Sequence, residues 1–217
     1  MKKIKIGVIG LGYVGLPVSV VFSNKYEVIG YDINNDRINK LNNNLDDTME
    51  ISSETLKKAI NGNLTISSNI DDILDCNFYI ITVPTPIDNN NKPDLSALLN
   101  ATKSVGKIIS KGDIIIYEST VFPGCTEEEC VPILESESNL KYNQDFYCGY
   151  SPERINPGDK THTIEKIVKI TSGSTKQVAK KIDEIYSSVI EAGTCLVSSI
   201  KVAEAAKVIE NTQRDVN

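Results

Sequence analysis

The chain has 217 residues, 40% of them hydrophobic, and a formal net charge of −6. This size allows one large globular domain, or one domain with a fragment of a second. The acidic balance, without a lysine–arginine cluster, disfavours nucleic-acid binding. No stretch reaches the roughly 18 apolar residues of a membrane span, and the first residues lead into an apolar run rather than a signal peptide. We therefore expect a cytoplasmic protein without membrane contact.

Apolar runs typical of buried strands alternate with segments of helical period along the chain. We expect strands at 5–9, 28–31, 78–83, 114–117, 146–149, 167–171 and 194–197. We expect helices at 14–24, 35–42, 95–109, 127–135 and 176–189. This alternation predicts an α/β fold, namely a Rossmann-like, doubly wound and mostly parallel sheet with helices on both faces.

Two segments depart from the alternation. Residues 42–69 contain a short capped helix at 54–60 that ends at Gly62, and we expect an excursion from the sheet there. From Ser199 an apolar period starts a new helix that reaches Asn217 without a cap signal. The expected organisation is thus a domain at 1–198 and the start of a truncated linking helix at 199–217.

A glycine pattern follows the first expected strand. Gly10, Gly12 and Gly15 stand in G-x-G-x-x-G spacing before a helix, and Asp32 closes the second strand 22 positions after Gly10. The first glycine permits a tight turn, the second lets backbone approach a pyrophosphate, and the third lets the helix pack closely. The carboxylate of Asp32 can accept hydrogen bonds from ribose hydroxyls and would repel a 2′-phosphate. The pattern therefore predicts a site for NAD rather than NADP; a glycine-rich turn that binds nothing is the alternative.

Prolines gather in the loops that follow the expected strands, where an open α/β sheet binds its ligands. They are Pro84, Pro86, Pro93, Pro123, Pro152 and Pro157. The cysteines are scattered without C-x-x-C spacing, so we expect no disulfide framework and no metal site. They are Cys76, Cys125, Cys130, Cys148 and Cys195.

Four further segments accompany the glycine pattern. They are Thr82-Val83-Pro84-Thr85-Pro86, Glu118-Ser119-Thr120-Val121-Phe122-Pro123-Gly124, the segment 150–159 (YSPERINPGD), and Ala203-Glu204-Ala205-Ala206-Lys207 with Asn211. Together these motifs resemble the UDP-glucose/GDP-mannose dehydrogenase family across essentially the whole chain. The form of segment 150–159 is similar to the branch that oxidises UDP-N-acetylhexosamines, whereas UDP-glucose enzymes tend to carry Phe-Leu-x-Glu-Gly after Ser-Pro-Glu.

The resemblance implies a two-step oxidation of a sugar C6 alcohol to a carboxylate with two NAD⁺, in surface polysaccharide biosynthesis. In the family, a cysteine in a C-terminal glycine-rich motif traps the intermediate aldehyde, and nothing like that motif occurs here. We therefore expect this chain to be the cofactor-binding half, inactive alone. The resemblance also implies a homodimer formed through the helix that begins near Ser199.

Roles for individual residues follow from the resemblance. It implies cofactor contacts for Gly10, Gly12, Tyr13, Val14, Gly15, Asp32, Arg37, Val83, Pro84, Thr85, Ser119, Thr120 and Glu153. It implies catalytic roles for Thr120, Glu153, Lys207 and Asn211, and substrate contacts for Glu153, Arg154, Ile155, Asn156, Lys207 and Asn211. Lys207 would stabilise the oxyanion that develops at C6, and Asn211 would add a hydrogen-bond donor from the same helix face.

Other readings of these residues stay open at this point. Glu153 could cap a turn, the threonines could satisfy loop backbone, and Lys207 could be a solvated helix lysine. We expect a structural role for Cys125 and a surface position for His162. Two alternative functions also remain: a related hydroxyacid or polyol-phosphate dehydrogenase, and a non-catalytic NAD-sensing domain.

Overall fold

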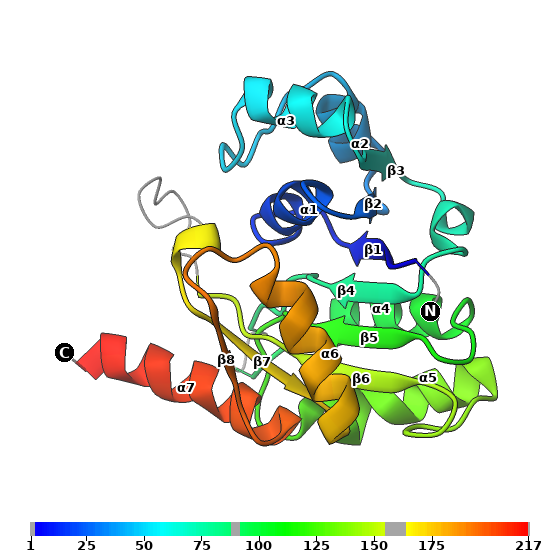
Figure 1. Cartoon of the computed structure of the whole chain (residues 1–217), viewed down its shortest axis with the longest axis vertical. Helices are drawn as coiled ribbons and strands as arrows, with labels where there is room; N and C mark the ends of the chain where they lie inside the picture. The colour runs from blue at the N-terminus through cyan, green and yellow to red at the C-terminus, as the bar shows by residue number, and fades with distance from the viewer. Residues whose placement is uncertain (1–2, 88–91, 155–163, 217) are drawn as a thin grey trace.

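A computed structural model describes residues 3–87, 92–154 and 164–216. Its centre is an eight-stranded sheet in the order β3-β2-β1-β4-β5-β6-β7-β8 (Figure 1). The strands are β1 Lys5–Ile9, β2 Glu27–Tyr31, β3 Leu64–Ser67, β4 Phe78–Ile81, β5 Ile114–Tyr117, β6 Tyr147–Tyr150, β7 Lys169–Gly173 and β8 Thr194–Leu196. All neighbouring strands run parallel except β6 and β7, which are antiparallel.

Helices cover both faces of the sheet. They are α1 Gly15–Ser23, α2 Asn35–Asn42, α3 Ser53–Ile60, α4 Ser96–Gly106, α5 Val131–Ser138, α6 Lys176–Ser187 and α7 Ile200–Val216, with 3-10 turns at Ile70–Ile73 and Ile164–Lys166. Buried side chains of α1, α2, α3 and α6 form one core cluster with the sheet, and those of α4, α5 and α7 form the other. Figure 1 shows α6 in front of the sheet and α4 behind it. The predicted Rossmann-like, doubly wound and mostly parallel fold is confirmed.

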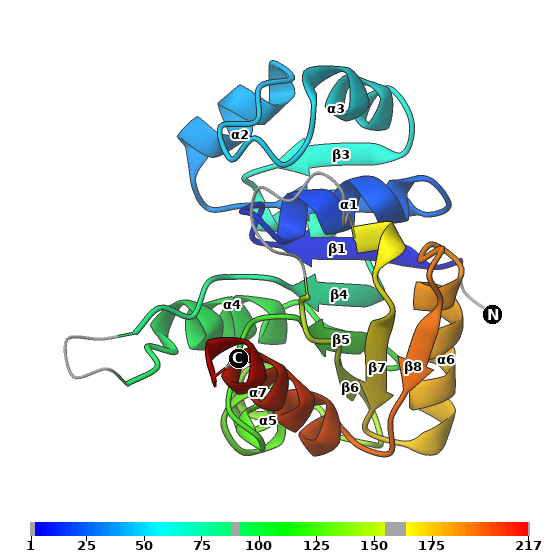
Figure 2. The same ribbon diagram turned by 90° about the vertical axis from the view of Figure 1, so that its left-hand side faces the viewer.

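The expected excursion at 42–69 is wrong in its second part. β3 joins the sheet as an edge strand parallel to β2, with Val28 opposite Leu64, and Figure 2 shows it beside α2 and α3. Its inward residues Leu64 and Ile66 are buried, whereas Thr65 between them is exposed. Two apolar residues in a four-residue strand give a weak local pattern, so pairing with β2 decides the structure here. The short helix itself is present as α3, capped by Ser52.

The helix expected at 127–135 is also displaced. One turn of π-helix spans Thr126–Cys130, and α5 continues from Val131 to Ser138. Pro132 lies in the first turn of α5 and has no N–H, so it cannot continue the preceding hydrogen-bond ladder. A proline in the first turn of a helix is tolerated, which explains why α5 begins there.

The parallel strands β1, β4, β5 and β6 bring four carboxyl ends to one edge of the sheet. The loops that leave this edge carry the glycine pattern and most of the prolines noted above; Pro157 lies outside the described residues. In an open α/β sheet this edge holds the ligands. No helix in the described part of the chain is both long and apolar enough to span a bilayer.

Candidate cofactor and sugar site

The glycine loop has the backbone that its sequence predicts. Gly10 has φ of +94°, a conformation that favours glycine, and its N–H donates to the carbonyl of Tyr31 at 2.8 Å. A Cβ on Gly15 would lie 1.7 Å from the carbonyl oxygen of Gly10, whereas a Cβ on Gly12 would meet nothing within 4 Å. Gly15 therefore allows the close approach of α1 to the loop, and the space over Gly12 is open.

The first turn of α1 faces this open space without a side-chain cap. Its N-cap residue is Val14, which accepts no hydrogen bond through its side chain. The first N–H groups of a helix lack partners within the helix, and together with the helix dipole they favour a phosphate group. The uncapped turn and the open approach at Gly12 fit the pyrophosphate of a dinucleotide.

Asp32 connects the glycine loop to the turn after β2. Its Oδ2 accepts from the N–H of Leu11 at 2.8 Å, and its Oδ1 accepts from the N–H of Asn34 at 2.9 Å. Each carboxylate oxygen has a further lone pair, so both can also accept from a ribose hydroxyl. The position at the carboxyl end of β2 fits the predicted adenosine contact.

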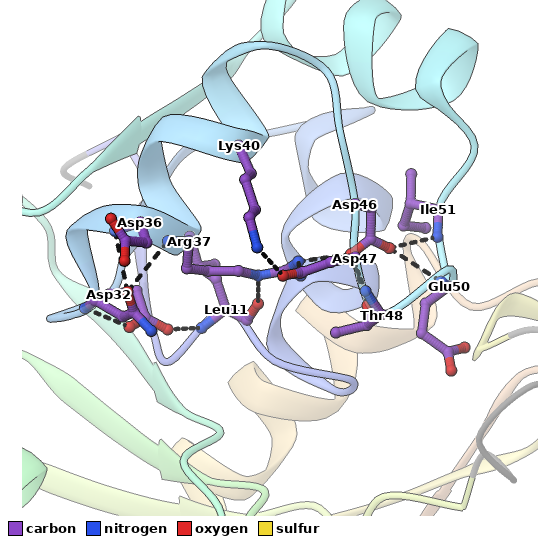
Figure 3. Close-up of polar contacts among 11 residues, drawn as sticks. Leu11, Asp32, Asp36, Arg37, Lys40, Asp46, Asp47, Thr48, Glu50 and Ile51 are labelled. Carbon is purple, nitrogen blue, oxygen red and sulfur yellow. Dashed lines mark hydrogen bonds and ion pairs between the residues drawn. The ribbon is translucent and has the colours of Figure 1, made fainter.

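Arg37 makes more contacts within the protein than its sequence position suggested. Its Nε donates to the carbonyl of Leu11 at 2.9 Å, and its Nη1 pairs with Asp46 at 2.8 Å and also with Asp47 (Figure 3). The residue is 8% exposed, and its buried Nη2 has no hydrogen-bond partner within the described chain. The guanidinium thus connects the glycine loop to the loop after α2, and its contact with the adenosine ribose stays a prediction.

Asp46 is a site residue that the sequence analysis missed. Its carboxylate accepts from the backbone N–H groups of Thr48, Glu50 and Ile51, in addition to its ion pair with Arg37. Burial alone would raise the pKa of Asp46, but the hydrogen bonds from Thr48, Ile51 and Arg37 lower this pKa below its ordinary value. An ionised Asp46 therefore fixes both the 46–51 loop and the arginine. The sequence shows only Asp46-Asp47-Thr48, an ordinary turn signal.

The loops after β4 and β5 are joined by side-chain hydrogen bonds. The hydroxyl of Thr85 donates to the carbonyl of Thr120 at 2.6 Å, and the hydroxyl of Ser119 donates to the carbonyl of Val83 at 2.6 Å. Residues from two predicted motifs therefore lie side by side at adjacent strand ends. The hydroxyl of Thr85 satisfies loop backbone, as the simpler reading of the threonines held, and so does that of Ser119. Thr120 is exposed.

Glu153 lies buried just beyond the end of β6, and several groups hold it. Its Oε1 accepts from the N–H of Arg154 at 2.6 Å, and its Oε2 lies 3.1 Å from Nζ of Lys169. Nζ of Lys207 donates to its carbonyl oxygen, across 54 positions of sequence. Helix α7 thus delivers Lys207 to Glu153, and Arg154 forms a two-bond ion pair with Glu210 on the same helix.

Some predicted site residues are not placed beside this cluster. Asn211 is exposed one turn beyond Lys207 on α7. Ile155, Asn156 and His162 lie outside the described residues. The predicted substrate contacts are therefore represented here by Glu153, Arg154 and Lys207.

Two further buried carboxylates gained no role from the sequence. Glu118 lies at the carboxyl end of β5, where burial raises its pKa although the nearby Lys169 lowers it. Glu204 on α7 accepts from the backbone N–H groups of Gly124 at 2.5 Å and Thr126 at 2.9 Å. Both residues belong to the motifs quoted above. The signal available in the sequence was a charged residue within a segment whose apolar pattern predicts burial. Lys169, inside an apolar strand pattern, carried the same signal.

Four of the five cysteines are buried, and Cys195 is exposed. The pKa of Cys125 is raised, mainly by a hydrogen bond with the Cys130 thiol and also by burial. The Cys125 thiol is therefore not poised as a nucleophile. These observations agree with the structural role expected for Cys125. Among residues 3–87, 92–154 and 164–216, no group of three or more His, Cys, Asp and Glu side chains could hold a metal ion.

Sheet order, glycine loop and Asp32 together define a dinucleotide-binding domain of the dehydrogenase type. The model of the UDP-glucose/GDP-mannose dehydrogenase family, NAD binding domain, matches residues 4–190. The chain belongs to this family and contains its NAD-binding domain; its cofactor is NAD.

Individual relatives agree with this assignment. The chain is 56% identical over 217 residues to UDP-N-acetyl-D-glucosamine 6-dehydrogenase of Pseudomonas aeruginosa, covering 100% of this chain and 51% of that protein. It is 59% identical over 212 residues to Protein CapL of Staphylococcus aureus, covering 98% and 49%. The structure of UDP-D-ManNAc dehydrogenase from Pyrococcus horikoshii superposes with a TM-score of 0.90 at 34% identity, covering 98% and 51%. The chain thus spans about half the length of the relatives it matches.

Proposed function

We propose that the protein containing this chain oxidises the C6 hydroxyl of a UDP-N-acetylhexosamine to the carboxylate, for surface polysaccharide biosynthesis. The observation that carries the proposal is the meeting of Lys207 with Glu153 beside the loops that hold Thr85 and Thr120. We place the nicotinamide beside the Lys207 ammonium and the Glu153 carboxylate, because a cation and a carboxylate suit the oxidation of an alcohol. The substrate class is supported by the UDP-N-acetyl-D-glucosamine and UDP-D-ManNAc dehydrogenases among the relatives.

Bound NAD⁺ supplies the hydride acceptor in both oxidations. Two hydrides leave C6 while a water supplies the second carboxylate oxygen, so the balanced reaction yields two NADH and three protons per sugar. The Lys207 ammonium stabilises the negative charge that develops on the C6 oxygen, and Asn211 adds a hydrogen bond to it. Glu153 accepts the hydroxyl proton or orients the water.

We assign the thiol that traps the intermediate aldehyde to the part of the protein outside this chain. Four cysteines are buried, namely Cys76, Cys125, Cys130 and Cys148, and the exposed Cys195 lies in β8 at the far edge of the sheet from the glycine loop. None of them adjoins Glu153 in the described contacts. We therefore propose that this half binds NAD and cannot complete the second oxidation alone.

The complete gene product tests this function. With UDP-GlcNAc, UDP-GalNAc, UDP-ManNAc and UDP-glucose as candidates, the N-acetylhexosamines should give two NADH per sugar consumed. Sugar turnover with one NADH, or turnover only of hydroxyacids or polyol phosphates, would overturn the proposal. If the complete protein binds NADH, oxidises none of these substrates and associates with another protein when NADH is bound, the NAD-sensing alternative would be favoured instead.

We further propose that residues 1–198 form the NAD-binding domain, and that α7 starts a helix through which the complete protein dimerises. β8 ends at Leu196 and α7 begins at Ile200, which supports the boundary. Val202, Val208 and Ile209 expose 45%, 42% and 66% of their surface on α7, which supports an apolar contact there. Light scattering on the complete protein should give twice the chain mass, and a monomer would refute the dimer. The cytoplasmic location stays a prediction.

A further inference from the structure

Lys169 is a buried lysine that the reaction scheme above does not use. It is the first residue of β7 and only 2% exposed. Removing an ammonium from water is strongly unfavourable unless charged partners replace the solvent. Nζ of Lys169 lies 2.7 Å from Oε2 of Glu118 and 3.1 Å from Oε2 of Glu153, so it bridges two carboxylates.

Glu118, one of the two carboxylates that Lys169 bridges, is fixed by its own contacts. Glu118 has a fully buried side chain, and its Oε1 accepts a hydrogen bond from the hydroxyl of Tyr186 on α6 at 2.5 Å. Three elements, namely the end of β5, the start of β7 and α6, therefore fix Glu118 and through it Lys169. The buried carboxylates raise the pKa of Lys169 against the effect of its burial, so the ammonium stays charged.

The near side of the bridge is the side chain of Glu153. Lys207 holds the main chain of this residue through its carbonyl oxygen, and the N–H of Arg154 contacts Oε1. The ammonium of Lys169 brings a positive charge to Oε2. An adjacent cation favours the ionised form of a carboxylate and limits the rotation of its side chain.

We propose that Lys169 is a positioning residue that holds the Glu153 carboxylate in one orientation toward the cofactor and the sugar. The inference rests on the proposed function, because it requires Glu153 to act in the reaction. Lys169 itself is separated from the substrate by Glu153 and acts through it. Glu118 and Tyr186 form the support that keeps Lys169 in place.

The test uses the complete protein with NAD⁺ and UDP-GlcNAc, at a temperature below the thermal unfolding midpoint of every variant. K169M should lower kcat at least 100-fold with less than a threefold change in KM for NAD⁺. The kcat of K169R should be at least tenfold higher than that of K169M. K176M, a surface lysine on α6 given the same substitution, should keep wild-type kcat. Equal kcat in K169R and K169M would overturn a role of the cation.

The double variant E118Q/K169M separates positioning from stability. It removes one buried charge of each sign, so its urea midpoint should lie closer to wild type than that of K169M, while kcat stays low. The acid limb of the kcat/KM profile of K169M, which keeps Glu118, should move to higher pH by about one unit, because Glu153 has lost the Lys169 ammonium. Recovery of kcat to within threefold of wild type in E118Q/K169M, or an unmoved acid limb in K169M, would overturn the inference.

Failure of the proposed function is distinguishable from failure of this inference. E153Q should lose at least as much kcat as K169M. Wild-type kcat in E153Q would remove the role of Glu153, and the inference with it. A low kcat in E153Q, together with a recovered kcat in E118Q/K169M, would overturn the positioning role of Lys169 alone.

Discussion

Alanine at Gly15 and at Gly12 should affect different properties, although both glycines belong to one motif. A Cβ on Gly15 would lie 1.7 Å from the carbonyl oxygen of Gly10 and 2.4 Å from Oγ1 of Thr82. The nearer atom is backbone of the glycine loop, so relief requires the main chain to move by more than about 1 Å. Overpacking of this kind destabilises by about 1–3 kcal/mol, and movement of main chain places G15A at the upper end.

This estimate gives a measurable change in thermal unfolding. A loss of about 3 kcal/mol lowers the midpoint of a domain of this size by roughly 6–12 °C. G12A meets no atom within 4 Å, so its unfolding free energy should stay within about 0.5 kcal/mol of wild type. The added methyl group would instead occupy the approach path of the pyrophosphate, and NADH affinity should fall at least tenfold, about 1.4 kcal/mol.

Scanning calorimetry without ligand and titration calorimetry with NADH measure the two effects. Gly112 provides a control: its φ of +92° is strained for alanine, no atom lies near its Cβ, and it lies away from the glycine loop. G112A should lose stability while its NADH affinity is kept. Wild-type thermal stability in G15A would refute the packing argument, and wild-type NADH affinity in G12A would refute the pyrophosphate placement.

Three further predictions follow from buried groups. D46N should lose about 1–3 kcal/mol of unfolding free energy at pH 7, because three backbone N–H groups lose a charged acceptor. The pKa of Asp46 is lowered in the folded chain, so this stabilisation is present above the ordinary value of 3.8 and is lost as the pH falls below it. The stabilities of wild type and variant should therefore converge in acid. E204A should lose about 2–4 kcal/mol in urea unfolding, because the buried N–H groups of Gly124 and Thr126 are left without their acceptor. A thiol reagent should label Cys195 alone in the native chain and all five cysteines after denaturation.

Matched changes on the surface provide the controls. D71N replaces an exposed aspartate in the 3-10 turn after β3, and E184Q replaces an exposed glutamate on α6; each should alter stability by less than about 0.5 kcal/mol. A gap between wild type and D46N that does not narrow as the pH falls below 3.8 would contradict the role of an ionised Asp46. E204A as stable as E184Q would show that the loop after β5 does not need its carboxylate, and labelling of C195S in the native state would contradict the burial of the other thiols.

Strong local signals made much of this fold predictable. The glycine pattern, its preceding strand and Asp32 all lie within residues 5–32, and their residue types and spacing are themselves the signal. α2 lies at the predicted residues 35–42 because Asn34 caps it and an apolar period follows. In contrast, β3 has only two inward residues, Leu64 and Ile66, and no local signal distinguishes it from a loop.

The candidate site divides in the same way. The motifs identified Glu153 and Lys207 separately, but their contact spans 54 positions and depends on where α7 packs. Glu118, Lys169 and Glu204 gained no role from the sequence, because a buried charge is recognised only when its partners are known. Arg37 was assigned to the cofactor, and the structure adds its ion pair with Asp46.

The sequence by itself determined the class of fold, the dinucleotide site and the family, because these depend on short segments whose residues act through their own backbone or their nearest neighbours. Only the tertiary structure decided how the buried charges are paired. A carboxylate such as Glu153 gains its environment from β7 and α7, which are distant in sequence and meet only when the sheet and its helices are assembled. Electrostatic interactions act through space, so their partners appear only with the folded chain.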